Sequence, residues 1–257
     1  MKTKPQFISL LLPVSNAQAT LKDTLDSLLS QTYPHFEVIA IDDNSKDDSY
    51  KILREYKKRD KRLIISRNVK RYGLSVTLNR ALREARGQFL GFVNQADIIT
   101  SDKLKRQLFY LNRHPKVAGV GTQVVTVDPE SKTQIKSDLP TDHETISKTF
   151  LTQNSLHLES VLINRYLLPM DLLKFEAQEY AVIYRTLLAK LLPYGQFANL
   201  NQHLYIKTLI QGSDFETVSK KAVAHAKLWL RARFVYKSEI SIQSLLHPIN
   251  NKIRPSA

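Results

Sequence analysis

Two apolar runs near the amino terminus each end in a cluster of polar side chains that could bind a ligand. Residues 7–12 are followed by Pro-Val-Ser-Asn at 13–16, and residues 36–41 are followed by Asp-Asp-Asn-Ser at 42–45. Carboxylate and amide oxygens of this kind accept hydrogen bonds from a polar ligand. The second cluster also suits a strand-to-helix turn with a capping residue, so the residues alone leave both interpretations open.

The segments around these clusters predict a strand, a turn, a helix and a second strand. Leu21, Leu25, Leu28 and Leu29 recur at helical spacing, and Pro34 ends the helix because the residue before a proline is pushed out of the helical region. In an open parallel sheet, ligands bind beyond the carboxyl ends of the strands, where neighbouring loops diverge. Both polar clusters are therefore expected at that edge of the sheet.

Five short segments, taken in order, closely resemble the family-2 glycosyltransferases of GT-A fold. They are residues 13–16, 27–37, 42–47, 72–75 with Asn79, and 85–89. The resemblance is dense over residues 7–127, thin over 139–221, and does not clearly cover the tail. It implies an α/β fold of GT-A type, with a mostly parallel Rossmann-like sheet flanked by helices and a C-terminal helical acceptor region.

The resemblance also implies a nucleotide-sugar site at the carboxyl edge of the sheet. The turn at 13–16 and the acidic pair would hold base and ribose, since a carboxylate accepts hydrogen bonds from a uracil N–H or a ribose hydroxyl. The expected donor is therefore a nucleotide-diphosphate sugar, UDP-linked. The expected donor-binding residues are Pro13, Val14, Asn16, Asp42, Asp43, Tyr72, Gly73, Asn79, Asn94 and Asp97.

The next motif departs from the family pattern. Residues 89–93 predict a buried strand, which the family follows with Asp-Ala-Asp-Asp, the carboxylates that carry a divalent cation. This chain has Asn94-Gln95-Ala96-Asp97 instead. Because magnesium and manganese prefer carboxylate oxygens, we expect either cation to be weakly held, with Asp97 as its one acidic ligand.

A second departure falls where the family places a Glu-Asp pair whose Asp is the general base of inverting members. The matching residues are Gln178 and Glu179. A glutamate within reach of an acceptor hydroxyl can take its proton as well as an aspartate can, so Glu179 is the expected catalytic base. The alternative is that Glu179 is a solvated helix residue.

Two functions of different class compete. The first is an inverting glycosyltransferase that moves a sugar from a nucleotide diphosphate to a glycan or lipid-linked acceptor in cell-surface polysaccharide synthesis. The second is a non-catalytic, nucleotide-binding or scaffold relative, which the altered Asn94, Ala96 and Gln178 favour. The intact base-and-ribose region favours the first, and we expect a transferase.

The charge of the chain indicates an anionic partner. Its 257 residues carry a net charge of +14, with a pI near 9.8, which attracts phosphate groups, nucleic acid or an acidic membrane. The run of basic residues over 54–71 predicts a solvated helix end and loop. Residues 220–237 mix basic with aromatic and aliphatic side chains, which is typical of a helix on an anionic membrane surface, although a helix packed on the domain has the same pattern.

Other observations narrow the class of protein. No nucleic-acid-binding motif is present, so no specific nucleic-acid partner is expected, and the absence of cysteine excludes disulfides and thiol chemistry. Residues 7–19 resemble a short signal peptide, but a proline interrupts the apolar run, which favours a core strand. No run approaches the roughly 20 apolar residues of a spanning helix. We expect a cytoplasmic protein, peripheral on the inner face of the membrane.

The expected organisation is a nucleotide-sugar-binding half at 1–128, an acceptor-side half of the same domain at 129–221, and a basic amphipathic tail at 222–257. Residues 128–142 are expected to form an excursion between the halves. The expected strands are 7–12, 36–41, 62–66, 89–93 and 117–127. The expected helices are 18–30, 46–58, 74–86, 102–112, 142–152 and 174–192.

Overall fold

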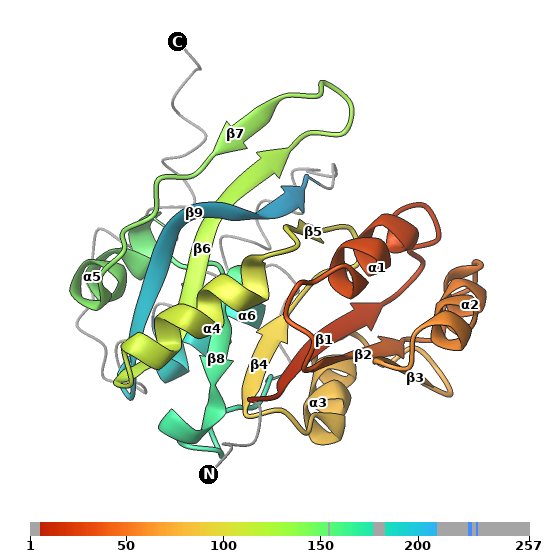
Figure 1. Ribbon diagram of the computed structural model, residues 1–257, viewed down its shortest axis with the longest axis horizontal. Coiled ribbons are helices and arrows are strands. Elements are labelled where there is room, and N and C mark those ends of the chain that lie inside the picture. Colours follow the sequence, from red (N-terminus) through yellow and green to blue (C-terminus); the bar gives the residue numbers. More distant parts are fainter. Residues whose placement is uncertain (1–5, 154, 177–182, 210–225, 228–229, 231–257) are drawn as a thin grey trace.

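The computed structural model describes residues 6–153, 155–176, 183–209, 226–227 and 230 (Figure 1). Its strands are β1 (Ile8–Val14), β2 (Phe36–Asp42), β3 (Leu63–Arg67), β4 (Phe89–Phe92), β5 (Ile98–Ile99), β6 (Val117–Val127), β7 (Gln134–Lys136), β8 (Leu162–Asn164) and β9 (Gln196–Thr208). Its α-helices are α1 (Leu21–Leu29), α2 (Ser49–Arg59), α3 (Leu74–Glu84), α4 (Lys103–Arg113), α5 (His143–Gln153) and α6 (Ile183–Leu191). Two short 3-10 turns, η1 (Leu158–Ser160) and η2 (Arg165–Leu167), flank β8.

The described strands form one nine-stranded sheet in the order β3-β2-β1-β4-β8-β6-β9-β5, with β7 paired to β6. β1, β2, β3, β4, β6 and β9 run in one direction, whereas β5, β7 and β8 run in the other. The expected α/β class with a mostly parallel sheet is confirmed. Because β8 lies between β4 and β6, the sheet continues without a break from residues 1–128 into residues 129–221.

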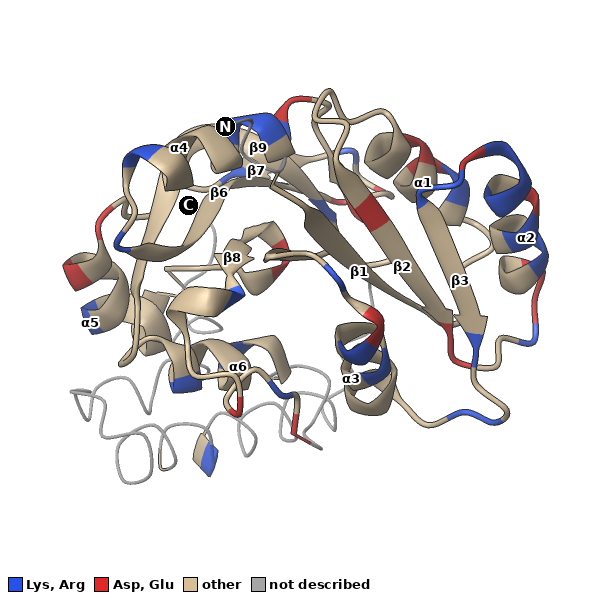
Figure 2. Ribbon diagram, turned by 60° about the horizontal axis from the view of Figure 1, so that its bottom comes forward, with Lys and Arg blue, Asp and Glu red and all other residues tan. Residues whose placement is uncertain are grey.

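Helices cover both faces of the sheet. Leu10 and Leu12 of β1 pack towards α1, α2 and α4, while Leu11 packs towards α3, α5 and α6; Figure 2 shows these two helical layers. The alternation follows from the strand period of two. All seven residues of β1 and of β2 are buried, as expected for parallel strands covered on both sides.

Most expected elements are present within a few residues, but the expected helix over 174–192 is wrong at its start. The described part of α6 is Ile183–Leu191, and residues 174–176 are not helical. The amide side chain of Asn79 donates to the carbonyl of Phe175 at 2.7 Å and accepts from its N–H at 2.9 Å. Those two bonds occupy the backbone groups that a helix would use.

Four strands of the structure were not predicted from the sequence. β5, β7 and β8 have only two or three residues each, and β7 falls within the expected excursion. β9 is long, but its polar and apolar residues do not alternate strictly. Asn199, for example, is polar and yet buried within the strand. Residues 129–221 therefore hold strands as well as helices.

The structure describes the apolar run near the amino terminus, but only three residues of the segment 220–237. The apolar run at the amino terminus is β1, a buried strand between β2 and β4, which agrees with the core-strand interpretation. Of the predicted interfacial segment 220–237, only Ala226, Lys227 and Leu230 are described, so that prediction lies outside the described residues. Within the described part of the chain, no helix has the length and apolarity needed to cross a membrane.

Gly87 occupies a site where the backbone of β1 leaves no room for a side chain. A Cβ at this position would lie 2.6 Å from the nitrogen of Ser9 and 2.8 Å from the carbonyl oxygen of Phe7. Gly87→Ala should therefore lower the free energy of unfolding by about 2–3 kcal/mol, as overpacking does elsewhere. Urea denaturation measures this, with the exposed Arg83→Ala as control; equal stability of the two variants would contradict the prediction.

Candidate functional site

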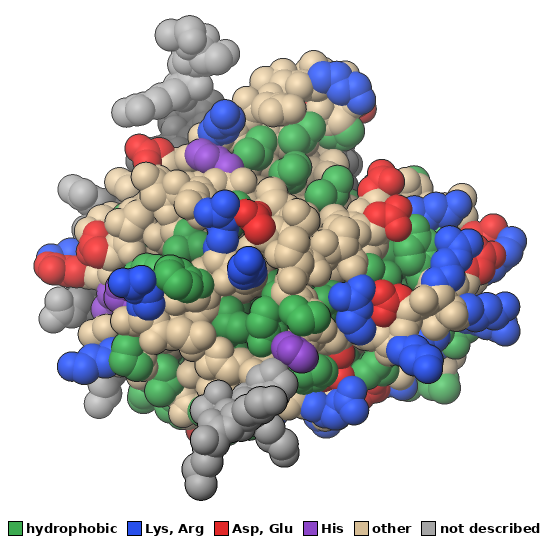
Figure 3. All heavy atoms as spheres, viewed as in Figure 1, with side chains coloured by type: hydrophobic (Ala, Val, Ile, Leu, Met, Phe, Trp, Pro, Cys, Tyr) green, Lys and Arg blue, Asp and Glu red, His purple; other side chains and the backbone are tan. Residues whose placement is uncertain are grey.

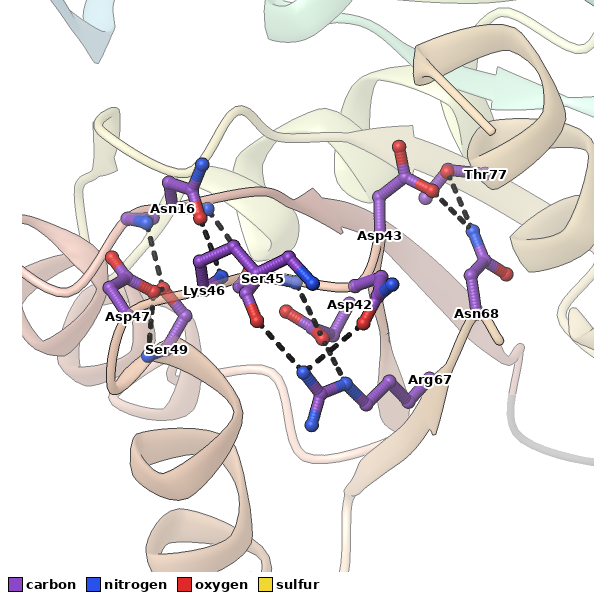
Figure 4. A network of polar contacts seen from close by, with 12 residues as sticks. Asn16, Asp42, Asp43, Ser45, Lys46, Asp47, Ser49, Arg67, Asn68 and Thr77 are labelled. Atoms are coloured by element: carbon purple, nitrogen blue, oxygen red, sulfur yellow. Dashed lines mark hydrogen bonds and ion pairs between the residues drawn. The ribbon is translucent and has the colours of Figure 1, made fainter. Parts of the chain in front are cut away.

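The loops that leave β1 and β2 are tied together at the carboxyl edge of the sheet (Figure 4). The N–H of Asn16 donates to Ser45 Oγ at 2.9 Å, and Asn16 Oδ1 accepts from the N–H of Lys46 at 2.8 Å. The N–H of Ala17 donates to Ser49 Oγ at 2.7 Å, and that of Gln18 to Asp47 at 3.0 Å. These bonds fix two loops that are about thirty residues apart in sequence into one rim.

The acidic pair after β2 points in two directions (Figure 4). Asp42 is fully buried, and its Oδ2 lies 3.0 Å from Nε of Arg67 and accepts from the N–H of Ser45 at 3.2 Å. Arg67 also donates to the carbonyl of Ser45 at 2.8 Å. Asp42 therefore anchors the loop after β2 to β3.

Asp43 holds the loop that enters α3. Its Oδ1 accepts from the amide of Asn68 at 2.7 Å and from the N–H of Tyr72 at 2.8 Å, and its Oδ2 accepts from the N–H of Gly73 at 2.7 Å. Burial alone would raise the pKa of this carboxyl, but the hydrogen bonds from Tyr72, Asn68 and Gly73 outweigh it and hold the pKa below its ordinary value. Asp43 is therefore ionised at neutral pH.

A pocket opens among three loops of this edge. It is lined by Pro13, Val14, Ser15, Asp43, Arg71, Gly73, Leu74, Thr77, Asn94 and Gln95. Pro13, Val14 and Leu74 give it apolar walls. Asp43 and Arg71 give it one anionic and one cationic group, so the pocket suits a ligand with an apolar ring, hydrogen-bonding edges and a negative charge.

The expected donor-binding residues divide into two groups in the structure. The pocket lining contains Pro13, Val14, Asp43, Gly73 and Asn94. The remaining five lie outside that lining and bind protein groups instead: Asn16, Asp42, Tyr72, Asn79 and Asp97. Their assignment to the donor stays a prediction.

The altered motif after β4 forms a closed hydrogen-bond network. Gln95 accepts from the N–H of Ser15 at 2.6 Å and donates to its carbonyl at 3.0 Å, so it joins this loop to the loop after β1. Asn94 accepts from the hydroxyl of Tyr184 at 2.8 Å and donates to Asp97 at 3.1 Å. Asp97 also accepts from the hydroxyl of Tyr205 at 2.7 Å and from the N–H of Thr208 at 3.1 Å.

This donor set does not fit a divalent cation. The described residues contain no group of three or more acidic, His or Cys side chains that could hold a metal. The carboxylate of Asp97 is 2 % exposed and both its oxygens are occupied by protein donors. A cation at this loop would have to displace those bonds, and residues 94–97 offer it no second carboxylate.

Several pocket residues were missed by sequence reasoning. Arg71 was part of a basic run expected to be solvated, and only the fold brings it to the pocket; it makes no hydrogen bond or ion pair with another described residue. Ser15 stands where the family commonly has Tyr, and its Oγ is buried without a hydrogen-bond partner among the described residues. Gln95 and Leu74 lie within the motifs at 94–97 and 72–75 but were not assigned to the site, and Thr77 lies just after the second of these motifs.

Glu179, the expected base, lies outside the described residues, but the chain on either side of 177–182 is fixed. The hydroxyl of Ser75 in α3 donates to the carbonyl of Glu176 at 3.0 Å. On the other side, Tyr184 of α6 binds Asn94, which lines the pocket. Of the described residues near this gap, Glu176 is thus bound to α3 and Tyr184 to the loop after β4.

Solved structures define the class of fold. The structure matches Staphylococcus aureus TarS 1–349 in complex with UDP with a TM-score of 0.70 and 20% identity, over 98% of this chain and 73% of that one. It matches the mannosyltransferase PcManGT from Pyrobaculum calidifontis, in complex with GDP-Man and Mn2+, with a TM-score of 0.68 and 16% identity, over 95% and 68%. The fold is that of the GT-A glycosyltransferases.

The sequence comparisons then give the family. The model for glycosyl transferase family 2 matches residues 9–165, more than half of the chain, and the chain belongs to this family. Over 104 residues it is 36% identical to a putative teichuronic acid biosynthesis glycosyltransferase, TuaG, of Bacillus subtilis (strain 168), covering 40% of this chain and 41% of the relative. Over 106 residues it is 31% identical to WfaP, a UDP-Glc:alpha-D-GlcNAc-diphosphoundecaprenol beta-1,3-glucosyltransferase of Escherichia coli, covering 41% of each.

Burial of Asp97 has a consequence for the pH dependence of stability. Loss of solvation raises the pKa of this carboxyl to about 6, although Tyr205 and Thr208 hydrogen-bond to it. A carboxyl whose pKa is raised by folding stabilises the folded state while it is protonated. For Asp97 this stabilisation is complete below the pKa of the unfolded chain, about 4, and is lost as pH rises through about 6. Asp97→Asn stays neutral, so its stability relative to wild type should rise by up to about 3 kcal/mol between pH 4 and pH 7.5.

Urea denaturation of wild type and Asp97→Asn at the two pH values measures this difference. The exposed Asp138→Asn is the control, for which no such trend is expected. A stability difference between wild type and Asp97→Asn that does not change with pH would contradict an Asp97 carboxyl buried as described.

Proposed function

We propose that this protein is an inverting glycosyltransferase that takes a sugar from a UDP-linked donor and transfers it to a glycan or lipid-linked acceptor in cell-surface polysaccharide synthesis. The observation that carries the proposal is the pocket at the carboxyl edge of β1, β2 and β4. It combines apolar walls with Asp43, Arg71 and the hydroxyl of Ser15, which has no hydrogen-bond partner in the part of the chain that the structure describes. TarS, of the same fold, is in complex with UDP, and WfaP is a UDP-glucose-dependent enzyme with a lipid-linked acceptor.

The pocket suits the nucleoside part of such a donor. A uracil ring would lie against Pro13, Val14 and Leu74, and its N–H or the ribose hydroxyls would find acceptors in Asp43 and Asn94. Arg71 can approach either a carbonyl of the base or a phosphate, because a guanidinium donates several hydrogen bonds in fixed geometry. Asp43 already accepts protein hydrogen bonds, so the pocket exists in its binding shape before the ligand enters.

Glu179 is proposed as the general base. Its carboxylate would take the proton of the acceptor hydroxyl while that oxygen bonds to the anomeric carbon and the bond from this carbon to the diphosphate oxygen breaks. Attack from the face opposite the leaving group inverts the anomeric configuration. The fixed chain at Glu176 and Tyr184 supports this placement.

The cellular setting is proposed from charge and from the acceptors of relatives. Figure 3 shows Lys and Arg side chains gathered over the end of the molecule formed by α2, whose last turn carries Lys57, Lys58 and Arg59. Together with the basic segment 220–237, this charge favours a cytoplasmic protein bound peripherally to an anionic membrane surface. There a lipid-linked acceptor would be within reach.

The nucleotide pocket can be tested by filling it. Leu74→Trp places a large ring in the lining at the start of α3, and it should weaken UDP binding at least tenfold by excluding the base. Val76→Trp is the matched control, because Val76 is on the same helix, 45 % exposed and outside the lining. Calorimetry with UDP measures both affinities. Equal UDP affinity in the two variants, or no UDP binding by the wild type, would contradict the proposed pocket.

The catalytic role of Glu179 predicts a loss of turnover without a loss of donor binding. Glu179→Gln should lower the rate by about a hundredfold to ten-thousandfold, the usual contribution of a general base, while UDP affinity changes less than twofold. Release of UDP from a panel of UDP-sugars with lipid-linked acceptors measures the rate, and Glu144→Gln on the exposed surface of α5 is the control. A variant retaining more than half of the wild-type rate would exclude Glu179, and a wild type that binds UDP without turnover would favour the scaffold alternative.

A further inference from the structure

Backbone pairing between β1 and β4 ends just before the pocket. The two strands pair in register up to Leu11 and Phe92, and the N–H of Val93 donates to the carbonyl of Leu11 at 3.1 Å. In a parallel ladder the next N–H would come from residue 13, but Pro13 has none. Beyond this point, the loop after β1 and the loop after β4 need another connection to stay together.

The side chain of Gln95 provides that connection. Its Oε1 accepts from the N–H of Ser15 at 2.6 Å, and its Nε2 donates to the carbonyl of Ser15 at 3.0 Å. A primary amide carries both an acceptor and a donor group, so this single side chain pairs with both backbone groups of Ser15, as a neighbouring strand would. We call these two hydrogen bonds the Gln95 clamp.

The Gln95 clamp is supported from α1. The hydroxyl of Thr20 donates to the carbonyl of Gln95 at 2.8 Å. Thr20 is the N-cap residue of α1, a position at which a threonine oxygen usually accepts from an N–H in the first turn of the helix. It makes no such capping bond here, so its hydroxyl holds the loop after β4 and not its own helix.

Both ends of the Gln95 clamp line the pocket. The lining includes residues 13–15 from the loop after β1, and Asn94 and Gln95 from the loop after β4. The clamp therefore fixes the distance between two segments of the pocket wall. The one carboxylate of residues 94–97 is that of Asp97, and protein donors occupy both its oxygens. Protein hydrogen bonds thus hold this loop at the place where the donor set does not fit a cation.

We propose that Gln95 is a positioning residue, whose clamp holds residues 13–15 and the loop after β4 at the separation that the nucleoside requires, so that donor binding needs no divalent cation. This inference rests on the proposed nucleotide pocket and adds the residue that sets its width. The family pattern has alanine at this position, and an alanine side chain could not form the clamp. The competing explanation is that Gln95 only stabilises the fold, in which case ligand affinity would not depend on it.

The test removes the clamp without changing the length of the side chain. Gln95→Met eliminates both hydrogen bonds to Ser15. Gln202→Met is the matched control, because Gln202 on β9 is exposed and outside the lining, and its side chain accepts from Arg106 at 3.3 Å. Thr20→Val removes only the supporting hydroxyl and is a milder second variant. Calorimetry measures the affinity for UDP and uridine in EDTA and for UDP in manganese, and thermal denaturation checks that each variant is folded at the assay temperature.

Gln95→Met should bind UDP and uridine each about tenfold more weakly than the wild type, the usual effect of losing two hydrogen bonds. The two losses should agree, because residues 13–15 are the wall proposed to lie against the base. Thr20→Val should lose about threefold, and Gln202→Met should stay within about twofold of the wild type. Manganese should change the UDP affinity of the wild type by less than about threefold, because residues 94–97 offer it no free carboxylate.

A folded Gln95→Met that binds both ligands as Gln202→Met does would overturn the role of Gln95 while leaving the pocket intact. A loss confined to UDP would do the same, since it would place the effect at the phosphates. If Gln95→Met is unfolded, an unchanged affinity of Thr20→Val decides against the proposal. Manganese-dependent UDP binding by the wild type would overturn the cation-free site, and a wild type without UDP binding would overturn the pocket and this inference together.

Discussion

The carboxylate of Asp43 connects three parts of the chain that meet only at the carboxyl edge of the sheet. It follows β2, it accepts from Asn68 after β3, and it accepts from the N–H groups of Tyr72 and Gly73 before α3. The loop entering α3 would otherwise expose backbone donors in a partly buried place, which is costly. With Asp43 ionised, that loop, the start of α3 and the pocket wall of Leu74 and Thr77 all take fixed positions. Removing the charge would loosen the wall of the pocket and not merely one contact.

The parts of this fold that could be predicted are those in which local pattern and tertiary environment agree. Sequence patterns predicted the buried strands β1 and β2 and the amphipathic helices α1 and α4, because the spacing of their apolar residues matches their burial. β9 could not be predicted, because this strand, next to the edge strand β5, buries Asn199. The amide nitrogen of Asn199 donates to the carbonyls of Pro140 and Ser155, which are distant in the sequence. The non-helical conformation of residues 174–176, where the expected helix was to start, depends on Asn79, almost a hundred residues earlier.

The candidate site was predictable in its place but not in the roles of its residues. Motif order located the pocket at residues 13–16, 42–43 and 94–97. However, Asp42 and Asp43 could not be told apart until their directions were known, since one binds Arg67 and the other borders the pocket. Arg71 was indistinguishable from its basic neighbours in the sequence, and only the fold shows that it lines the pocket.

The pairing of β9 also has a consequence for how the site comes into existence. β5 has its described partner in β9, and Asp97 takes its donors from Tyr205 and Thr208. During synthesis, Asp97 therefore leaves the ribosome more than a hundred residues before Tyr205 and Thr208, which donate to its carboxylate. Parallel pairing of β6 with β9 closes a long stretch of chain, and such distant contacts form slowly. The amino-terminal half can build its sheet early, but the loop of Asn94 and Gln95, which lines the pocket, reaches its final hydrogen bonding only when the last described strand is in place.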